Sequence, residues 1–497
     1  MLFYTNKNYR FRPLISEFPA FSLNLDGWDD YNTKSTFHLI YHPTNNTNHE
    51  IGSIKIIKKD EQTTINKLQT GELDTILPQS FPILDEDCIS LAQDIAFFSN
   101  LLDYCGREVA IDALESLREI SWQPPLAAPF EPLAPFRNSL LRANSAHKAR
   151  RFGQAVIRGD DIDERFSFTY SARIPGADAP TECTFDFDET DLVPGRIIGI
   201  IGRNAVGKTK FLAQLAEDLV QNRPISVLKA MERDEKFRGQ KPIFNRIITI
   251  SYSAFDKFVR PKSQQVSYVY CGIRDEKGGL SRRSLVSTYK SNLQRIRLYN
   301  RQYRWIEFMQ EILGDQSQGL REHLDAEISS NELEDETLSL LSSGQAILAN
   351  FITSLVAWIE PNSLVLFDEP ETHLHPNAVA NLFNVFNSAL KEFNSFAVVA
   401  THSPLVIQEI PSKRVILFQR NENITTAEQL PLETFGSNIS ELTRHVFETI
   451  EIPTYYRTVL DRLSHRKTFD EVMALFDNNL SINAQSYLMT RYMGRPE

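Results

Sequence analysis

A glycine-rich loop between an expected strand and an expected helix constrains this chain more than any other stretch. Residues 197–201 form an apolar run typical of a buried parallel strand, and apolar residues at helical spacing follow from 211 to 219. Between them the chain matches the pattern G-x-x-x-x-G-K-[ST] with Gly202, Arg203, Asn204, Ala205, Val206, Gly207, Lys208 and Thr209. The glycines let successive backbone N–H groups point at a polyphosphate at the helix N-terminus, so we expect all eight residues to bind nucleotide.

Three later motifs supply the rest of a nucleotide site. Ser342, Ser343, Gly344 and Gln345 precede a very apolar helix, the strand 363–367 runs into Asp368 and Glu369, and the strand 397–400 runs into Thr401 and His402. Lys208 is expected to contact the β- and γ-phosphates, and Thr209 and Asp368 to hold Mg²⁺. Glu369 is then placed to act as general base for the attacking water, and His402 to sense the γ-phosphate.

These motifs, in this order, resemble those of ABC-type ATPases over residues 165–420. The resemblance implies an α/β fold with a mixed, largely parallel core sheet, helices on both faces, an antiparallel β subdomain and a helical lobe. It also implies ATP and Mg²⁺ as cofactors, and slow, regulatory hydrolysis in which Lys208, Glu369 and His402 are catalytic. The family forms a head-to-tail homodimer, or a higher even oligomer, in which each ATP lies between one subunit's phosphate loop and the other subunit's residues 342–345.

Two departures from the ABC-type motifs indicate which branch of that family the chain resembles. No glutamine follows the strand 246–252 directly, so Ser253 or Asp256 is expected in the Q-loop role. Residues 369–376, Glu-Pro-Glu-Thr-His-Leu-His-Pro, resemble the D-loop region of the OLD, RecF and SMC-like branch, which works on nucleic acids or guards against phage. His373 and His375 are of metal-ligand type, but we favour a capped helix start before Pro376.

Missing motifs separate this chain from several members of that branch. Its four cysteines form no C-x-x-C pair for a zinc hook, and no D-x-D for a Toprim nuclease follows His402. What remains resembles the ATPase component of Septu-type anti-phage systems, including retron-associated ones, through Arg203-Asn204, residues 251–256, residues 433–438 and the helical C-terminus. The implied partners are a separately encoded HNH nuclease and, in retron versions, a reverse transcriptase with its nucleic acid.

Two other functions stay open. A RecF-like DNA-repair ATPase would bind DNA with ATP on its own, and a transporter ATPase would need a membrane partner. The segment 282–304 bears on the RecF-like function. It carries no acidic residue and seven basic ones: Arg282, Arg283, Lys290, Arg295, Arg297, Arg301 and Arg304. The aromatic residues Tyr289, Tyr299 and Tyr303 are interleaved, and Trp305 follows directly. This segment is either a DNA or RNA contact or a helical face whose aromatics pack inward.

Composition sets the cellular context. The formal net charge of −11 argues against a protein coated in nucleic acid or membrane, although it permits a local basic patch. Scattered cysteines, no apolar run long enough for a bilayer and no signal-peptide core predict a cytoplasmic protein without a membrane partner.

The chain is long enough for several domains. We expect six parts: an N-terminal α+β extension (1–123), a proline-rich connector with a basic helix (124–164), an N-terminal ATPase lobe (165–256), a helical insertion (257–340), a C-terminal ATPase lobe (341–430) and a C-terminal helical region (431–497). The extension should contain strands near 21–25, 36–41 and 51–57, a helix capped by Asp85 that runs through Leu102, and a helix over 111–120. Residues 450–497 are the expected output surface.

Overall fold

The protein is described from a computed structural model. The described residues are 1–5, 13–27, 33–59, 73–74, 77–162, 164, 166–190, 192–220, 226–252, 258, 267–272, 282–314, 318–329, 341–372, 374–446 and 455–493. The chain forms two compact units, Met1–Ser437 and Asn438–Glu497.

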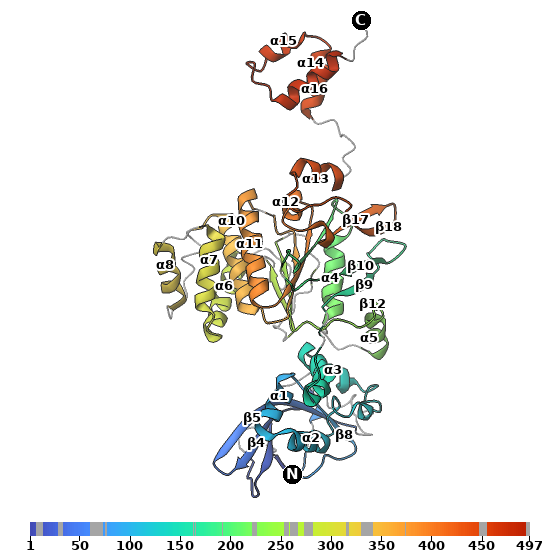
Figure 1. Ribbon diagram of the computed structural model, residues 1–497, viewed down its shortest axis with the longest axis vertical. Coiled ribbons are helices and arrows are strands. Elements are labelled where there is room, and N and C mark those ends of the chain that lie inside the picture. Colours follow the sequence, from blue (N-terminus) through green and yellow to red (C-terminus); the bar gives the residue numbers. More distant parts are fainter. Residues whose placement is uncertain are drawn as a thin grey trace. The chain divides into compact units, whose positions relative to one another are not determined.

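A seven-stranded sheet organises the larger unit (Figure 1). Its order is β14 (Tyr268–Gly272), β13 (Ile247–Ser251), β15 (Leu364–Asp368), β16 (Phe396–Thr401), β11 (Ile197–Gly202), β17 (Val415–Asn421) and β18 (Ile424–Gln429). All neighbouring strands are parallel except β17 and β18, which are antiparallel. The expected strands before the phosphate loop, Asp368 and His402 are therefore the three adjacent strands β11, β15 and β16, whose carboxyl ends meet at one edge.

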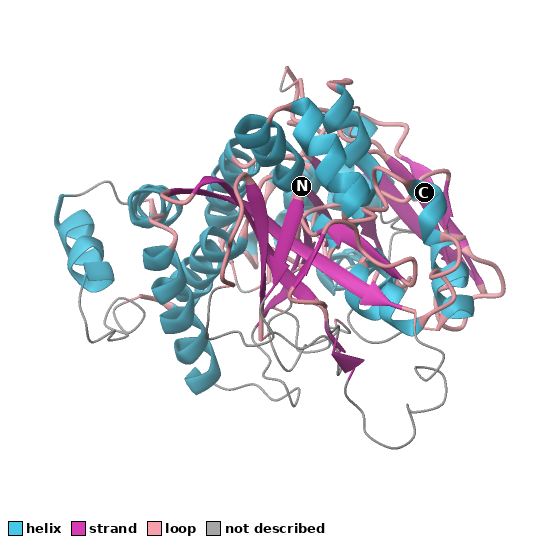
Figure 2. Cartoon of the chain, turned by 90° about the horizontal axis from the view of Figure 1, so that it is seen from below, coloured by secondary structure: helices cyan, strands magenta, loops and turns pink. Residues whose placement is uncertain are grey.

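Both faces of this sheet are covered by helices, as Figures 1 and 2 show. Leu364 and Leu366 point toward one face and belong to the same apolar cluster as α4 (Lys208–Leu219). Phe367 points to the other face, where it stacks on Phe351 of α10 (Ser343–Trp358) at 5.1 Å and meets Phe386 of α11 (Pro376–Glu392) at 6.0 Å. Burial on both faces explains why β15 is apolar up to its last residue. The ABC-type α/β fold predicted from the motifs is confirmed.

The remaining parts of this lobe also match the expected plan. A three-stranded antiparallel sheet contains β10 (Thr181–Phe185), β9 (Phe168–Ala172) and β12 (Phe237–Arg238). The helices are α5 (Val227–Asp234), α6 (Arg282–Leu298), α7 (Gln302–Leu313), α8 (Gln318–Ser329), α12 (Pro404–Ile407) and the short η5 (Ser412–Arg414). The expected helical insertion differs in one respect, because it contributes the edge strand β14, which pairs with β13 through five residues.

The N-terminal extension is an α+β layer of its own. Its six-stranded sheet contains β7 (Ser80–Phe81), β1 (Leu2–Thr5), β2 (Ala20–Leu25), β4 (Thr36–Thr44), β5 (Thr47–Lys58) and β8 (Cys88–Ala92). Also present are β3 (Thr33–Lys34), β6 (Leu73–Asp74), η3 (Pro124–Ala127), η4 (Phe136–Leu140), α1 (Ala96–Cys105), α2 (Arg107–Ser116) and α3 (Asn144–Arg158). The expected strands are confirmed.

Two expectations for this extension are wrong in detail. The predicted helix from Asp85 through Leu102 is replaced by β8 and then α1, because the wholly buried residues Cys88–Ala92 pair with β5. The proline-rich segment, expected to be a stiff connector without regular structure, instead packs into the core and contains the short helices η3 and η4. Ala127, Phe130 and Phe136 belong to an apolar cluster with residues of β5 and β8, so prolines break regular structure here without excluding the chain from the core.

The smaller unit is helical and has its own core. It contains α13 (Ile439–Val446), α14 (Tyr455–Ser464), α15 (Phe469–Ala474) and α16 (Ile482–Met493). Leu460, Val472, Ala484 and Leu488 pack together, and a capping box between Thr468 and Glu471 begins α15. In the described parts of the chain no helix is both long and apolar enough to span a membrane.

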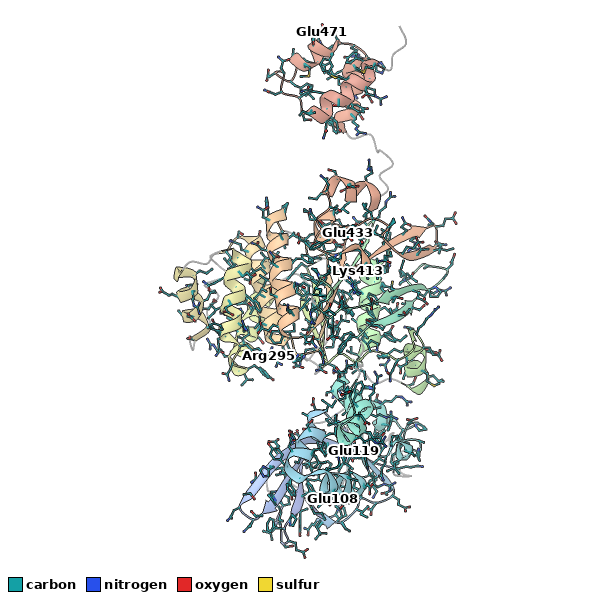
Figure 3. The ribbon with its side chains drawn as sticks, in the orientation of Figure 1. Glu108, Glu119, Arg295, Lys413, Glu433 and Glu471 are labelled. Carbon is teal, nitrogen blue, oxygen red and sulfur yellow. The ribbon has the colours of Figure 1, made fainter. Side chains whose placement is uncertain are left out.

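A buried carboxylate organises the turn after α2. Glu119, labelled in Figure 3, is fully buried. Its oxygens accept hydrogen bonds from the backbone N–H groups of Ala92 (3.2 Å), Ser121 (2.9 Å) and Trp122 (3.0 Å). Burial raises the pKa of Glu119, while these hydrogen bonds act in the opposite direction. The side chain thus satisfies backbone donors that the β8 edge and this turn leave without other partners.

We predict that Glu119→Ala lowers the free energy of unfolding by about 3 kcal/mol or more, because it leaves buried backbone donors unsatisfied. Urea unfolding of the full chain measures this. The control is Glu108→Gln on the exposed first turn of α2 (Figure 3), which should cost less than about 1 kcal/mol. Equal losses in the two variants would contradict this role of Glu119.

Candidate nucleotide site

The phosphate loop curves around the side chain of Lys208 at the N-terminus of α4. The Nζ of Lys208 donates to the carbonyl oxygens of Gly202 (2.9 Å) and Arg203 (3.2 Å). Ala205 and Gly207 adopt positive φ values of 70° and 107°. A Cβ at Gly207 would also lie 2.5 Å from the Cγ2 of Ile174, so glycine is required there by backbone and packing alike.

The predicted magnesium ligands are in contact. The Thr209 hydroxyl donates to the Asp368 carboxylate, with Oγ1 at 2.9 and 3.0 Å from the two carboxylate oxygens. Asp368 is completely buried at the end of β15. Hydroxyl and carboxylate oxygens are the ligands that Mg²⁺ prefers, and Mg²⁺ keeps several of its waters when protein-bound. The donor set therefore fits Mg²⁺.

Glu369 lies directly beyond that ligand, in a strained conformation. Its φ is 51°, and its backbone N–H donates to Ala400 of β16 at 2.8 Å. The side chain lies 4.0 Å from the Nζ of Lys208. Burial and the neighbouring Glu371 raise the pKa of Glu369 to about 9, while Lys208 acts in the opposite direction. In this arrangement Glu369 holds a proton at neutral pH, and the positive charge of a bound Mg²⁺ would favour the ionised form that a base requires.

A second glutamate, not predicted as a site residue, positions the histidine. Glu371 accepts from the Thr401 hydroxyl (2.6 Å) and the backbone N–H of His402 (3.2 Å). The His402 ring hydrogen bonds to Glu369 through Nδ1, which also lies 3.3 Å from Glu371. Ligand atoms of Glu369, Glu371 and His402 all lie within 4.8 Å of one another, so they could also hold a metal ion. The sequence signal for Glu371 is a second acidic residue in the Glu-Pro-Glu motif.

The phosphate loop, Glu369 and His402 line one pocket of about 540 Å³. Its lining is Ile174, Asn204, Ala205, Gly207, Lys208, Thr209, Lys210, Glu369, Thr372, His402 and Arg420. Arg420 comes from β17 and donates to the Gly176 carbonyl at 2.6 Å. Ile174 and Arg420 lie far from the motifs in sequence and carried no signal of their own.

The signature residues lie elsewhere and are not part of that lining. Ser342 caps α10, and a capping box joins it to Gln345, whose side chain accepts from the Ser342 N–H at 3.1 Å. Ser342, Ser343 and Gln345 are exposed, and Gly344 is partly exposed. An exposed helix N-terminus presents backbone N–H groups that favour an anion.

Two secondary expectations have different outcomes. His375 caps α11, with Nδ1 accepting from the Asn377 N–H at 3.4 Å and Pro376 at the first helical position, so the capped helix start is confirmed. His373 and the Q-loop candidates Ser253 and Asp256 lie outside the described residues.

The basic segment 282–304 is largely committed to internal contacts. Arg295, labelled in Figure 3, donates to the Ala357 carbonyl at 2.8 Å, and Arg301 donates to the carbonyls of Val356 and Ile359 at 2.7 Å. All three carbonyls lie at the C-terminal end of α10, where such groups lack helical partners. Arg297 donates to the Glu327 carbonyl, and Arg304 pairs with Glu307 and Glu392. The aromatics are divided, because Tyr289 and Trp305 are buried whereas Tyr299 and Tyr303 are exposed. These contacts favour the helical-face interpretation.

Comparison with known proteins finds one family model and several similar chains. Residues 274–408 match the family model described as "AAA domain, putative AbiEii toxin, Type IV TA system". The matched segment contains the signature residues, Asp368, Glu369 and His402, and it begins after the phosphate loop. It is 26% identical to Protein ea59 of Escherichia phage lambda, over 98% of this chain and 97% of that protein.

Solved structures with similarity to this ATPase-type chain include the SMC head domain from Thermotoga maritima. That alignment is 11% identical, covers 54% of this chain and 100% of that chain, and has a TM-score of 0.32. Another is cbiO1 from Clostridium perfringens, part of the ABC transporter complex cbiONQ, at 15% identity over 63% of this chain and 100% of that chain, with a TM-score of 0.28. The fold assignment itself rests on the strand order and the placement of the motifs.

We predict that Glu369→Gln lowers ATP hydrolysis by about 10²–10⁴-fold while ATP binding persists, because only the proton acceptor is lost. Lys208→Ala should instead abolish ATP binding, because the phosphates lose their main cation. Phosphate release and the fluorescence of a labelled ATP analogue measure the two effects. The control, Glu428→Gln on the exposed face of β18, should behave as wild type. Wild-type hydrolysis by Glu369→Gln would exclude Glu369 as the base.

Proposed function

We propose that this chain is a regulatory ATPase that binds ATP with Mg²⁺, dimerises around it, hydrolyses it slowly and controls a separately encoded nuclease of HNH type. The setting proposed is a cytoplasmic anti-phage system of the Septu or retron type. One observation carries the ATPase part: Lys208, Thr209, Glu369 and His402 line one pocket, and the Thr209 hydroxyl is bonded to Asp368 at the end of β15. The anti-phage part rests on the motif resemblance alone.

The chain's own residues suggest how the reaction proceeds. Lys208 and the loop N–H groups hold the phosphates, and Thr209 and Asp368 would hold Mg²⁺, which neutralises charge on the phosphate oxygens. Glu369 takes a proton from the attacking water as the water oxygen bonds to the γ-phosphorus. The bond between that phosphorus and the β,γ-bridging oxygen breaks at the same time, and ADP leaves with the electron pair on that oxygen. His402, oriented by Glu371, lies beside Glu369 and donates toward the γ-phosphate oxygens.

The exposed signature supports a dimer. Ser343 and Gly344 begin α10 and do not line the phosphate-loop pocket, so they are available to a nucleotide held by another subunit. A nucleotide that contacts both subunits stabilises the dimer by mass action. ATP would then couple its own hydrolysis to subunit geometry, which a partner protein can read.

We predict that a non-hydrolysable ATP analogue shifts the wild-type chain toward a dimer, and that Ser343→Arg prevents this by crowding the γ-phosphate. Analytical ultracentrifugation with and without the analogue measures the populations. Ser388→Arg, at an exposed site on α11, is the matched control and should dimerise normally. If the wild-type chain is equally dimeric without nucleotide, ATP does not join the subunits. If Ser343→Arg also hydrolyses ATP at the normal rate, residues 342–345 do not belong to the nucleotide site.

The smaller unit is the proposed docking site for the nuclease. It has its own core and exposes large apolar side chains, including Leu475 (55% exposed), Phe476 (40%) and Ile482 (80%). Apolar groups gathered outside a core are typical of protein interfaces. Removing residues from 467 onward would delete α15 and α16 and leave Leu460 of α14 without its core partners Val472 and Leu488. Surface substitutions therefore test docking more cleanly than truncation.

We predict that the double variant Leu475→Asp, Phe476→Asp keeps wild-type ATPase activity but no longer co-purifies with the nuclease. Buried charge at an apolar contact is strongly unfavourable, whereas both side chains lie outside the core. The double variant Asn483→Asp, Ser486→Asp, at exposed positions of α16, is the matched control, because it adds the same charge and should retain the nuclease. Retention of the nuclease by the charged variant would move the docking site elsewhere in the chain.

A RecF-like DNA-binding ATPase is the alternative, supported by the basic segment 282–304. Most of its described arginines are engaged with backbone carbonyls or carboxylates, which leaves less charge for a phosphate backbone. ATP-dependent DNA binding by the purified chain alone would favour this alternative. A transporter ATPase would instead co-purify with a membrane protein. Isolation of the native complex separates all three functions.

A further inference from the structure

A small cationic cavity lies between α3 of the extension and the ATPase lobe. Its volume is about 110 Å³. The lining side chains come from α3, the end of α4, α5 and the segment before β13, and are Asn144, His147, Arg151, Leu219, Arg233, Asp234, Lys241, Pro242 and Ile243. None of them lines the phosphate-loop pocket. The motifs singled out no residue of this cavity.

Two cations of this cavity are more deeply buried than its one carboxylate. Three cations, Arg151, Arg233 and Lys241, face one carboxylate, Asp234. Asp234 lies 3.2 Å from the Nε of Arg233 and 3.6 Å from the Nζ of Lys241. Its side chain is 53% exposed, whereas those of Arg233 and Lys241 are only 11% and 20% exposed. The Nζ of Lys241 also donates to the backbone carbonyl of Asp218 at 2.5 Å, which carries no formal charge, and the Asp218 carboxylate pairs with Lys236. Two buried cations therefore share one carboxylate of the lining, and that carboxylate is largely in water.

The pKa shifts of Lys241 and His147 agree with this geometry. Burial and the charge of Arg233 lower the pKa of Lys241 to about 7. Burial, Lys241 and Arg233 lower the pKa of His147 to about 3, so its imidazole stays neutral at physiological pH. A neutral imidazole offers one N–H donor without adding to the repulsion. An anion here would relieve the mutual repulsion of the two cations and favour the charged lysine.

A larger pocket adjoins the cavity and would hold the rest of a ligand. Its volume is about 410 Å³, and Arg151 and Ile243 line both. It also contains the ring of Phe152 and the polar side chains of Gln240 and Arg238. Glu164, its one carboxylate, pairs with Lys148 at 2.7 Å, so its charge is already compensated. The two spaces together suit a compact anionic group joined to a partly apolar body.

We infer that this double pocket binds a small phosphomonoester, with the phosphate between Arg233, Lys241 and Arg151 and the organic part beside Phe152. A terminal phosphate carries up to two charges and three free oxygens, which matches several converging donors. A nucleic-acid phosphodiester carries one charge and continues in two directions, which a cavity of about 110 Å³ does not accommodate. The site would let a small phosphorylated metabolite act on the chain independently of ATP.

Calorimetric titration of the full-length Lys208→Ala protein tests this site without the phosphate loop. The probes are inorganic phosphate, adenosine 5′-monophosphate and a 20-base-pair DNA duplex. Saturable binding of phosphate, and binding of the monophosphate at least as tight, are expected. No saturable binding of either, or tighter binding of the duplex than of the monophosphate, would overturn the inference.

Two substitutions locate the binding. Arg233→Gln and Lys241→Met should each weaken the affinity for the monophosphate about tenfold or more, and methionine preserves the packing of the Lys241 stem near the Phe237 ring. Lys229→Gln, on the exposed face of α5 and outside the lining, is the matched control and should leave the affinity unchanged. With Lys208 intact, each variant should still be stabilised against heating by ATP, which shows that it folds. Unchanged affinity in both lining variants would place the ligand elsewhere and refute the assignment.

Discussion

The hydrogen bond from the Thr209 hydroxyl to the Asp368 carboxylate joins the two halves of the nucleotide site. These residues are 159 positions apart in the sequence. They meet because β11 and β15 flank β16 in a parallel sheet, so all three strands deliver their carboxyl ends to one edge. Helices hold this sheet on both sides, since α4 covers one face and α10 and α11 cover the other.

Concentrating charge at that edge has an electrostatic cost. Burial lowers the pKa of Lys208 and raises that of Glu369, so each group departs from its ordinary titration in the direction that weakens its charge. Backbone strain accompanies this, since Ala205 and Glu369 hold positive φ values although both carry side chains. A nucleotide with Mg²⁺ would add the countercharges that this arrangement lacks. The site is therefore prepared for a ligand at the expense of local stability.

Two arginines donate hydrogen bonds to backbone carbonyls at the C-terminal end of α10. That helix is so apolar that its C-terminal carbonyls are buried with it, and Arg295 and Arg301 reach them with side-chain donors. The stems of such residues also pack well, and Arg295 lies over the Trp358 ring at 3.9 Å. Helix capping thus accounts for Arg295 and Arg301 in a basic run that could have indicated nucleic-acid binding.

The sequence by itself determined the parts of this protein that depend on local pattern. The phosphate loop, the strands before Asp368 and His402, and the capped start of α11 were all predicted, because glycine spacing, apolar runs and capping residues act over a few neighbours. Only the tertiary structure decided the contacts between distant segments: the edge strand β14, the packing of the proline-rich segment, the clamp of Glu371 on the end of β16, and the cations around Lys241. Such contacts depend on which strand edges and helix ends the folded chain brings together, and no local pattern records that.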